Sequence, residues 1–520
     1  MKNLLLCSIA LVMSCNTSQK TISETSKATE VKIVDPSAYA ASITEEELKE
    51  HLYIYASDEY EGRETGTPGQ KKAIAYLKTA YEKLGLPAAK SDGNYFQNVP
   101  LEVTKLPTGS MTVGEQEYVI GTDFVSFGES QASFNEIIYV GYGIEEGEYS
   151  DYKDLDVSGK LVIYKSGEPM NEDGTYALSG TSEASSWGSD NAVLETKVKL
   201  AEEKGAGGIL TYAPKLYPRI AAYYNRSVNS ESDRMSIKSD DKRLFSGLIS
   251  EKMAKSIITD IDTNAIPKAQ SVVSKVMAVG NSKTINSENV VAILKGSEKP
   301  NEYVVISSHL DHIGVNADGE INNGADDDGS GTVALLEIAQ AFKKAADEGN
   351  GPKRSIVFLH VTGEEKGLLG SQYYTDFDPI VPLSQTVANL NIDMIGRIDP
   401  KREGKRNYIY LIGSDKLSTD LHSLSEEVNA KYANIELDYT YNDENDPNRF
   451  YYRSDHYNFA KNNIPIIFYF NGTHDDYHRP TDTPDKINYD LLQNRTRLIF
   501  HTAWEVANRD QRVIVDKASK

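Results

Sequence analysis

The sequence predicts an α/β fold in which a mostly parallel central sheet is flanked by helices. In residues 266–520, short apolar runs alternate with helical patterns, as in strand–helix–strand units. The composition is that of an ordinary globular protein, with 39% hydrophobic and 25% charged residues. A chain of 520 residues is long enough for more than one domain, and we expect a second, smaller α/β unit before the main one.

The charge balance excludes some functions. Asp and Glu number 77 against 55 Lys and Arg, which gives a formal net charge of -22. Nucleic-acid binding depends on basic surface, so we expect no nucleic-acid partner. The two cysteines, Cys7 and Cys15, lie near the N-terminus, so a disulfide framework in the folded body is not expected. A zinc ion in that body would be held by His, Asp and Glu.

Residues 1–15 have the pattern of an export signal. Lys2 precedes a short apolar stretch at 4–13, too short to span a bilayer. The four residues ending at Cys15 resemble a bacterial lipobox, in which the cysteine is lipidated; the alternative is an ordinary signal peptide. Residues 16–40 are rich in Ser, Thr and Lys, as in a tether. We therefore predict an exported bacterial protein, either a cell-envelope lipoprotein or a periplasmic or secreted protein.

Residues 41–130 are expected to form the N-terminal part of the main domain. Apolar residues recur at spacings of four and three from Leu48, which predicts a helix, and Thr44 begins a capping box before it. A turn-rich loop at 61–69 leads to a second helix, which we expect to stop at Gly85.

Residues 131–265 predict the smaller α/β unit. Its expected strands are 137–140, 161–164 and 209–212, and its expected helix is 197–204. The stretch 168–192 is rich in Gly and Ser and is predicted to be a loop. The unit contains no cluster of metal-ligating residue types.

The main block, 266–520, carries the longest series of elements. The predicted strands are 303–308, 355–361, 387–393, 408–412 and 464–470, and the predicted helices are 332–344, 417–428 and 491–506. In such folds, ligands bind beyond the carboxyl ends of the strands.

Metal-ligating residue types follow these strands. The residues are His309, Asp327 within a run of three Asp, Glu364 with Glu365, Asp393 and His478. Each has an ordinary explanation alone, such as a helix cap or a surface charge, but five such positions at the ends of one sheet indicate a site. Imidazole and carboxylate ligands suit zinc. Crowded carboxylates also need cations between them.

The motifs at 309–311, 324–331, 363–368, 391–397 and 477–483 resemble those of the co-catalytic di-zinc aminopeptidases. That family includes secreted bacterial and yeast vacuolar aminopeptidases, glutamate carboxypeptidase and the transferrin receptor. The resemblance extends to the loop at 56–69, and residues 131–265 resemble a protease-associated domain. It implies a zinc-exopeptidase fold with that domain inserted.

The resemblance also implies two zinc ions per chain. The implied ligands are Asp327 bridging both ions, Glu365 and His478 completing one site, and His309 and Asp393 completing the other. Glu364 would be the general base, and Asp311 would hydrogen-bond the imidazole of His309.

Other candidates near the motifs are weaker. Asp455, Arg397 and Tyr477 are possible substrate-pocket residues, although packing or a structural ion pair explains each equally well or better. Three further histidines are expected not to be ligands: His312, His360 and His474.

The function expected from the resemblance is that of an exported zinc aminopeptidase acting on peptides. The alternatives are a carboxypeptidase or dipeptidase on the same scaffold, or a non-catalytic receptor-like binding protein. The protease-associated block is expected to flank the cleft and limit access. A membrane contact is expected only through lipid on Cys15.

Overall fold

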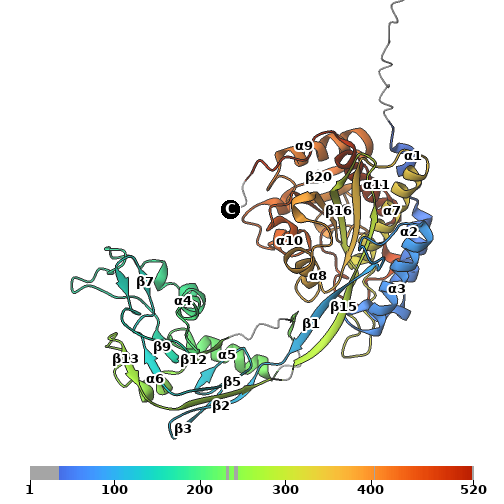
Figure 1. Cartoon of the computed structure of the whole chain (residues 1–520). Helices are drawn as coiled ribbons and strands as arrows, with labels where there is room; N and C mark the ends of the chain where they lie inside the picture. The colour runs from blue at the N-terminus through green and yellow to red at the C-terminus, as the bar shows by residue number, and fades with distance from the viewer. Residues whose placement is uncertain (1–33, 230–233, 239–243, 281, 403, 518–520) are drawn as a thin grey trace, which may run out of the picture.

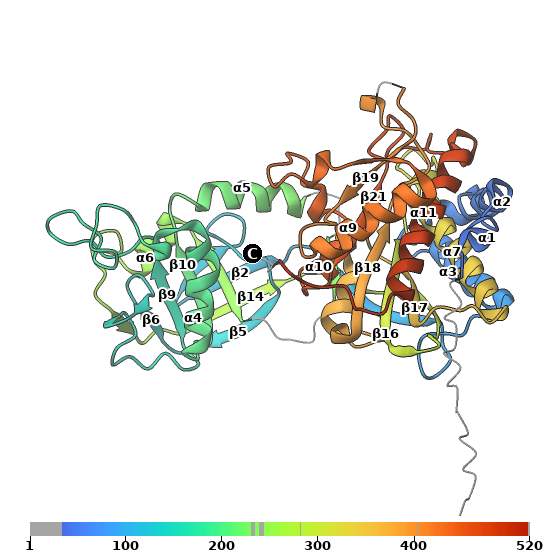
Figure 2. The same ribbon diagram turned by 90° about the horizontal axis from the view of Figure 1, so that it is seen from above.

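The computed structural model describes residues 34–229, 234–238, 244–280, 282–402 and 404–517. The predicted export signal, Cys15 and most of the tether lie outside these residues. The described chain forms a larger body and a smaller one, and long strands run from the larger body toward the smaller (Figures 1 and 2).

The larger body is built on a nine-stranded sheet. In spatial order the strands are β11 (Arg234–Ile237), β1 (Phe96–Thr104), β15 (Ser282–Leu294), β17 (Arg354–Val361), β16 (Lys299–His309), β18 (Thr386–Ile392), β21 (Ile466–Phe470), β19 (Tyr408–Ile412) and β20 (Glu436–Asp438). The four strands β17, β16, β18 and β21 are mutually parallel, and antiparallel pairs lie on both sides of them. The predicted fold class and all five predicted strands of the main block are confirmed.

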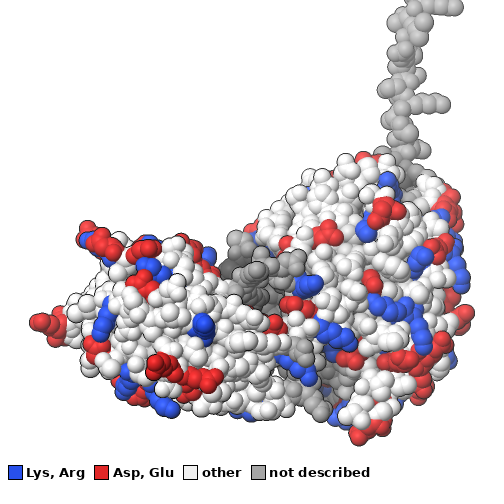
Figure 3. Space-filling view, turned by 60° about the horizontal axis from the view of Figure 1, so that its bottom comes forward, with Lys and Arg blue, Asp and Glu red and all other residues white. Residues whose placement is uncertain are grey.

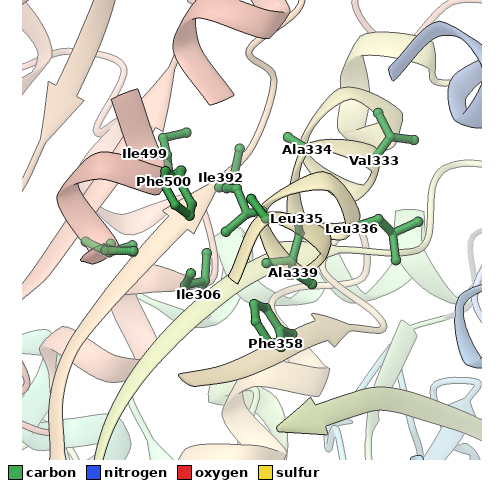
Figure 4. Close-up of a cluster of buried hydrophobic side chains, with 14 of the residues drawn as sticks. Ile306, Val333, Ala334, Leu335, Leu336, Ala339, Phe358, Ile392, Ile499 and Phe500 are labelled. Carbon is green, nitrogen blue, oxygen red and sulfur yellow. The ribbon is translucent and has the colours of Figure 1, made fainter. Parts of the chain in front are cut away.

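Helices cover both faces of this sheet. One face packs against α1 (Ser37–Ala40), α2 (Glu45–Tyr55), α3 (Pro68–Leu84), α7 (Gly331–Asp347), α9 (Thr419–Val428) and α11 (Tyr489–Asn508). The other face packs against α10 (His456–Ala460) and the turn Tyr373–Phe377, which follows α8 (Leu369–Gln372). Strand residues alternate between the faces, so that Ile306 packs among the α7 and α11 side chains of Figure 4 while Val305 belongs to the opposite core.

The N-terminal helices begin and end where the sequence predicts. The Thr44 hydroxyl accepts a hydrogen bond from the amide of Glu47 at 3.2 Å, so the first helix is capped as expected. Gly85 ends α3 with φ +69°, a left-handed conformation that favours glycine. The three predicted helices of the main block are also present, as α7, α9 and α11.

The smaller body contains two sheets. The first has the order β13 (Lys268–Gln270), β6 (Ile137–Tyr139), β9 (Leu161–Lys165), β10 (Gly208–Tyr212), β12 (Phe245–Ile249) and β4 (Phe124–Val125). The second has the order β3 (Gln116–Val119), β2 (Thr108–Val113), β14 (Ser274–Val279) and β5 (Ser130–Phe134). The remaining elements are β7 (Glu145–Glu146), β8 (Tyr149–Ser150), α4 (Lys197–Glu203), α5 (Tyr217–Val228) and α6 (Glu251–Ile257).

This smaller body takes in strands on both sides of the range 131–265. β14 lies between β2 and β5 and pairs antiparallel with each, although β2 precedes the range and β14 follows it. Met111 and Val276, from these two strands, share one buried cluster with Leu210 in the first sheet. On the larger body, β1 pairs with β15 on one side and with β11 on the other, so the strands that precede and follow the smaller body are neighbours in the large sheet.

The surface is mixed in charge. On the face seen in Figure 3, acidic and basic side chains are interspersed over both bodies. None of the helices in the described part of the chain is long and apolar enough to cross a membrane.

The aromatic contact between α7 and α11 should carry a large share of the stability of the larger body. Phe500 is fully buried, and its ring centroid lies 4.9 Å from that of Phe342. Phe500→Ala should lower the free energy of unfolding by about 3–5 kcal/mol, because it leaves a cavity between two helices. Phe377, which is 59% exposed, provides the control, and Phe377→Ala should cost less than about 1.5 kcal/mol. Guanidinium unfolding of both variants measures the difference, and similar losses would contradict the assignment of the core.

Candidate metal centre

The carboxyl ends of the four central parallel strands bring the predicted ligands together. His309 is the last residue of β16, and Asp393 directly follows β18. Glu365 lies in the loop after β17, and His478 lies in the loop after β21. Asp327 comes from the turn Ala325–Ser330, which leads into α7.

Asp327 lies between two groups of side chains, and each of its oxygens faces one of them. Its Oδ1 is 3.2 Å from His309 Nε2, which is 3.6 Å from Asp393 Oδ1. Its Oδ2 is 3.0 Å from His478 Nε2, which is 3.2 Å from Glu365 Oε2. Both groups have the spacing of a candidate metal site, and they share Asp327.

These residues fit zinc. His309 Nε2 and Asp327 Oδ2 are buried and have no hydrogen-bond partner in the described structure, so both atoms are available as ligands. A tetrahedral zinc ion with bonds of 2.0–2.2 Å separates its ligand atoms by roughly 3.4 Å, close to the observed spacings. The donor set of imidazole nitrogen and carboxylate oxygen is also one that zinc accepts.

His312 is the residue at this centre whose position the sequence does not predict. It is completely buried, and its Nδ1 lies 2.7 Å from Glu365 Oε1 and 3.8 Å from Asp327 Oδ2. From the sequence, His312 is expected not to be a ligand; the structure places it in hydrogen-bond contact with Glu365 and within one of the two candidate ligand groups. Its hydrogen bond engages the Glu365 oxygen opposite the one that faces His478, so His312 orients this carboxylate. The feature of the sequence that points to His312 is its position directly after Asp311, in the loop that follows the strand ending at His309.

Asp311 differs from the expectation in one respect. Its carbonyl oxygen, at 3.0 Å, accepts from His309 Nδ1, whereas its carboxylate lies 4.0 Å away. This bond fixes the tautomer that leaves Nε2 free to face Asp327. The carboxylate accepts from the Thr65 hydroxyl at 2.7 Å and from the Glu364 amide at 3.2 Å. Asp311 therefore connects the ligand loop of β16 to the Glu364 loop.

Two further groups hold the carboxylate ligands. The Ser454 hydroxyl donates to Asp393 Oδ2 at 2.6 Å, and the amide of Asn391 donates to Ser454 at 3.0 Å. Asp482 Oδ2 accepts from the backbone amides of Asp326 and Asp327 at 2.9 and 3.2 Å. These contacts fix the ligand directions before any ion binds. Asp482 lies in the motif at 477–483, and Ser454 directly precedes the weaker candidate Asp455, but the roles of both depend on tertiary contacts.

The charges of the centre are strongly coupled. Burial opposes a charge on His478, but the carboxylates of Asp327 and Glu365 outweigh it and raise the pKa of His478 to about 10. Burial opposes ionisation of Glu365, and so does the charge of Asp327; hydrogen bonds from His312 and His478 nevertheless lower its pKa to about 2. Burial raises the pKa of Glu364 well above its usual value, with further contributions from Glu365 and Asp393. Adjacent carboxyl groups therefore differ in their proton affinity.

A pocket opens onto this centre. It is lined by Asp327, Glu364, Asp393, Met394, Phe450, Arg453, Phe468, Phe470, Thr473, Tyr477 and His478. Of the weaker candidates, only Tyr477 lines the pocket, with its ring stacked on that of His478 at 3.9 Å.

The other weaker candidates have structural partners. Arg397 pairs with Asp476 at 2.8 Å and lies 3.6 Å from Asp482, so the expectation of a structural ion pair is confirmed. Asp455 is completely buried and accepts from the Ser371 hydroxyl at 2.5 Å.

The two remaining histidines contact groups outside the ligand set. His360 lies between the hydroxyls of Tyr81 and Ser308, at 2.7 and 2.9 Å. His474 lies 3.2 Å from Asp326. Both lie outside the candidate ligand groups.

Comparison with known proteins supports the resemblance. Residues 289–503 match the family model for Peptidase family M28, and this range contains all five predicted ligands and Glu364. The match confirms the resemblance predicted from the motifs.

Relatives with curated names include aminopeptidases. Aminopeptidase YwaD of Bacillus subtilis is 25% identical over 269 residues, which are 48% of this chain and 51% of the relative. The protein named "probable leucine aminopeptidase 2" of Aspergillus oryzae is 26% identical over 456 residues, which are 85% of this chain and 76% of the relative. The protein named "Probable glutamate carboxypeptidase LAMP1" of Arabidopsis thaliana is 34% identical over 115 residues, 22% of this chain and 16% of the relative. The chain thus spans about half of the B. subtilis relative and less of the A. thaliana one.

Among solved structures, an aminopeptidase from Aneurinibacillus sp. strain AM-1 is 18% identical. The alignment covers 93% of this chain and 99% of that chain, with a TM-score of 0.46.

Zinc binding should release protons and should tighten as the pH rises. With its pKa near 10, His478 holds a proton at pH 7 in the metal-free protein, and a ligand must lose it. The apparent zinc affinity should therefore increase roughly tenfold per pH unit for each proton released, between pH 6 and 9. Calorimetric titration in two buffers with different ionisation enthalpies measures the proton release. His422→Gln, which changes a histidine outside the centre, should leave it unchanged, and zinc binding without proton release would contradict the charge states described.

Proposed function

We propose that the chain is an exported zinc aminopeptidase that removes N-terminal residues from peptides. The observation that carries the proposal is the pair of ligand groups sharing Asp327 beside Glu364 in one pocket. The match to Peptidase family M28 over the same residues supports it. Two zinc ions per chain would be held, one by His309 and Asp393, the other by Glu365 and His478, with Asp327 common to both.

Bound zinc would supply Lewis acidity, which lowers the pKa of water and polarises a peptide carbonyl. The protein supplies the base. Glu364 lines the pocket, and burial raises the pKa of its carboxyl group, so this group has a higher proton affinity than a solvent-exposed glutamate. It accepts the proton of the attacking water and delivers it to the leaving amine. The Asp311 carboxylate holds the backbone of Glu364, so that the base stays in place during turnover.

The names of two relatives support the choice of an aminopeptidase over an endopeptidase: Aminopeptidase YwaD and the protein named probable leucine aminopeptidase 2. Of the carboxyl groups that line the pocket, Asp327 and Asp393 would be zinc ligands, which leaves Glu364 outside the ligand set. A carboxypeptidase or dipeptidase on the same scaffold is the second candidate, since one relative is named a glutamate carboxypeptidase.

Export and the flanking domain are further parts of the proposal. The apolar stretch at 4–13 and the lipobox-like residues before Cys15 support export with a lipid anchor. Membrane fractionation of cells producing the full chain or its Cys15→Ala variant tests the anchor. The smaller body supports the proposed protease-associated domain by being a separate α/β unit beside the peptidase core.

The zinc-loaded protein lacking residues 1–15 should hydrolyse free aminoacyl 4-nitroanilides. Chelation should abolish the activity, added zinc should restore it, and N-acetylated substrates should be inert if a free α-amine is recognised. Hydrolysis of blocked peptides from their C-terminal end would instead favour the carboxypeptidase.

Glu364→Gln separates the base from the metal ligands. We expect kcat to fall about 10²–10⁴-fold, since glutamine cannot accept the proton, while the zinc content stays that of the wild type. Glu444→Gln makes the same chemical change at an exposed position and should leave both unchanged. Near-normal turnover in Glu364→Gln, with zinc bound, would contradict the assignment of the base.

A further inference from the structure

One basic side chain lies among the acidic and aromatic walls of the pocket. Arg453 is the single Lys or Arg among the lining residues, all of which belong to the described chain. The walls around it include Phe450, Phe468 and Phe470. The pocket therefore combines an apolar surface with one permanent positive charge.

A backbone hydrogen bond and a cation–π contact, both with Phe450, hold Arg453 in position. Its amide donates to the Phe450 carbonyl at 3.1 Å, and its guanidinium carbon lies 5.0 Å from the centre of the Phe450 ring. The next residue, Ser454, donates to Asp393 of the metal centre. The position of Arg453 is thus tied directly to that of a candidate ligand.

Arg453 has no carboxylate partner among the residues that the structure describes, and it is exposed. Arg397 shows the contrast. It lies near the same centre, but Asp476 and Asp482 neutralise it, and it does not line the pocket. A guanidinium presents five donors in a planar fork that matches a carboxylate, and those of Arg453 remain available to a molecule in the pocket.

We propose that Arg453 binds a carboxylate of the substrate and makes acidic peptides the preferred class. This inference rests on the proposed function, since it names the substrate that the same pocket takes. The carboxylate has two possible sources within reach of the cleaved bond: an acidic side chain on the N-terminal residue, or the C-terminal carboxylate of a dipeptide. In both cases a bidentate guanidinium–carboxylate contact supplies the recognition.

The phenylalanines of the pocket support this proposal, because their rings can pack against the methylene groups of an acidic side chain. The methylene groups of a glutamate side chain can pack on Phe450, Phe468 or Phe470 while its oxygens reach Arg453. An uncharged side chain gains only the first contact. The pocket should therefore discriminate Glu from Gln, which have nearly the same shape.

The first experiment compares zinc-loaded wild type, Arg453→Gln and Arg449→Gln on glutamyl, glutaminyl and leucyl 4-nitroanilides. Arg449 is the matched control, since it is an exposed arginine of the same loop that stacks on Tyr452 and does not line the pocket. For the wild type we expect kcat/KM for the glutamyl substrate to exceed that for the glutaminyl substrate by about tenfold or more. Arg453→Gln should remove the preference for the glutamyl substrate and leave kcat/KM for the leucyl substrate within about twofold of the wild-type value. Arg449→Gln should change neither the preference nor leucyl hydrolysis. Arg453→Lys should retain part of the glutamyl preference, because lysine keeps the positive charge.

A second pair of substrates distinguishes the two sources of the carboxylate. If the C-terminal carboxylate of a dipeptide is the ligand, wild type should prefer Leu-Gly over Leu-Gly-amide and Arg453→Gln should not. If the acidic side chain is the ligand, only the glutamyl preference depends on Arg453. If Arg453→Gln lowers kcat/KM equally for all substrates, the role of Arg453 is structural. If it lowers kcat/KM for none of them, Arg453 has no role in recognition. Either result overturns the proposal.

A binding measurement keeps the inference separate from the proposed activity. If no aminoacyl anilide is hydrolysed, the proposed function fails, but calorimetric titration of the zinc-loaded protein with glutamate, glutamine and glutamate α-amide still tests Arg453. Tighter binding of a ligand with the additional carboxylate, lost in Arg453→Gln and retained in Arg449→Gln, would support the proposal. Equal affinities for all three ligands would overturn it.

Discussion

The burial of Asp327 between two groups of ligands is the constraint on which the rest of the centre depends. An ionised carboxylate at 3% exposure is costly unless positive charge lies close to it. Here His309 and His478 lie at its two oxygens and, although burial opposes it, lower its pKa well below the usual value. In the metal-free protein these imidazoles carry the compensating protons, and zinc would replace the protons with metal charge. The same geometry therefore satisfies both the folded apoprotein and the loaded centre.

The sheet makes this arrangement possible because it brings distant segments to one edge. β17, β16, β18 and β21 are neighbours and run parallel, so their carboxyl ends converge although their sequence positions are far apart. The loops between them supply the groups that fix each ligand, as Asp311 does for His309 and Ser454 does for Asp393. The cost of assembling so many buried polar groups is offset by the apolar layers on both faces.

The sequence is informative for the centre because each ligand follows a recognisable apolar strand. His309 and Asp393 could be predicted from this pattern, and the motifs supported Glu365, Asp327 and His478. Contacts that are set by tertiary packing could not be predicted in the same way. His312 looks like any buried histidine until Glu365 is placed beside it, and the pairing of β14 with β2 joins segments more than a hundred residues apart in the chain. For the same reason, the boundaries of the smaller body are harder to predict than its central strands.

Different charged groups of the pocket recognise different parts of the substrate. Asp327 and Asp393 would hold zinc, so Glu364 is the lining carboxyl group that stays outside the ligand set. Arg453 is the arginine that lines the pocket, and it has no carboxylate partner in the described structure, so it can hold the carboxylate of a substrate away from Glu364. Arg397, paired with Asp476 and Asp482, stabilises the loops beneath the centre and has no charge left to offer. The two arginines therefore differ in their partners. Arg397 is held in ion pairs and has a structural role, whereas Arg453 is available to bind the substrate.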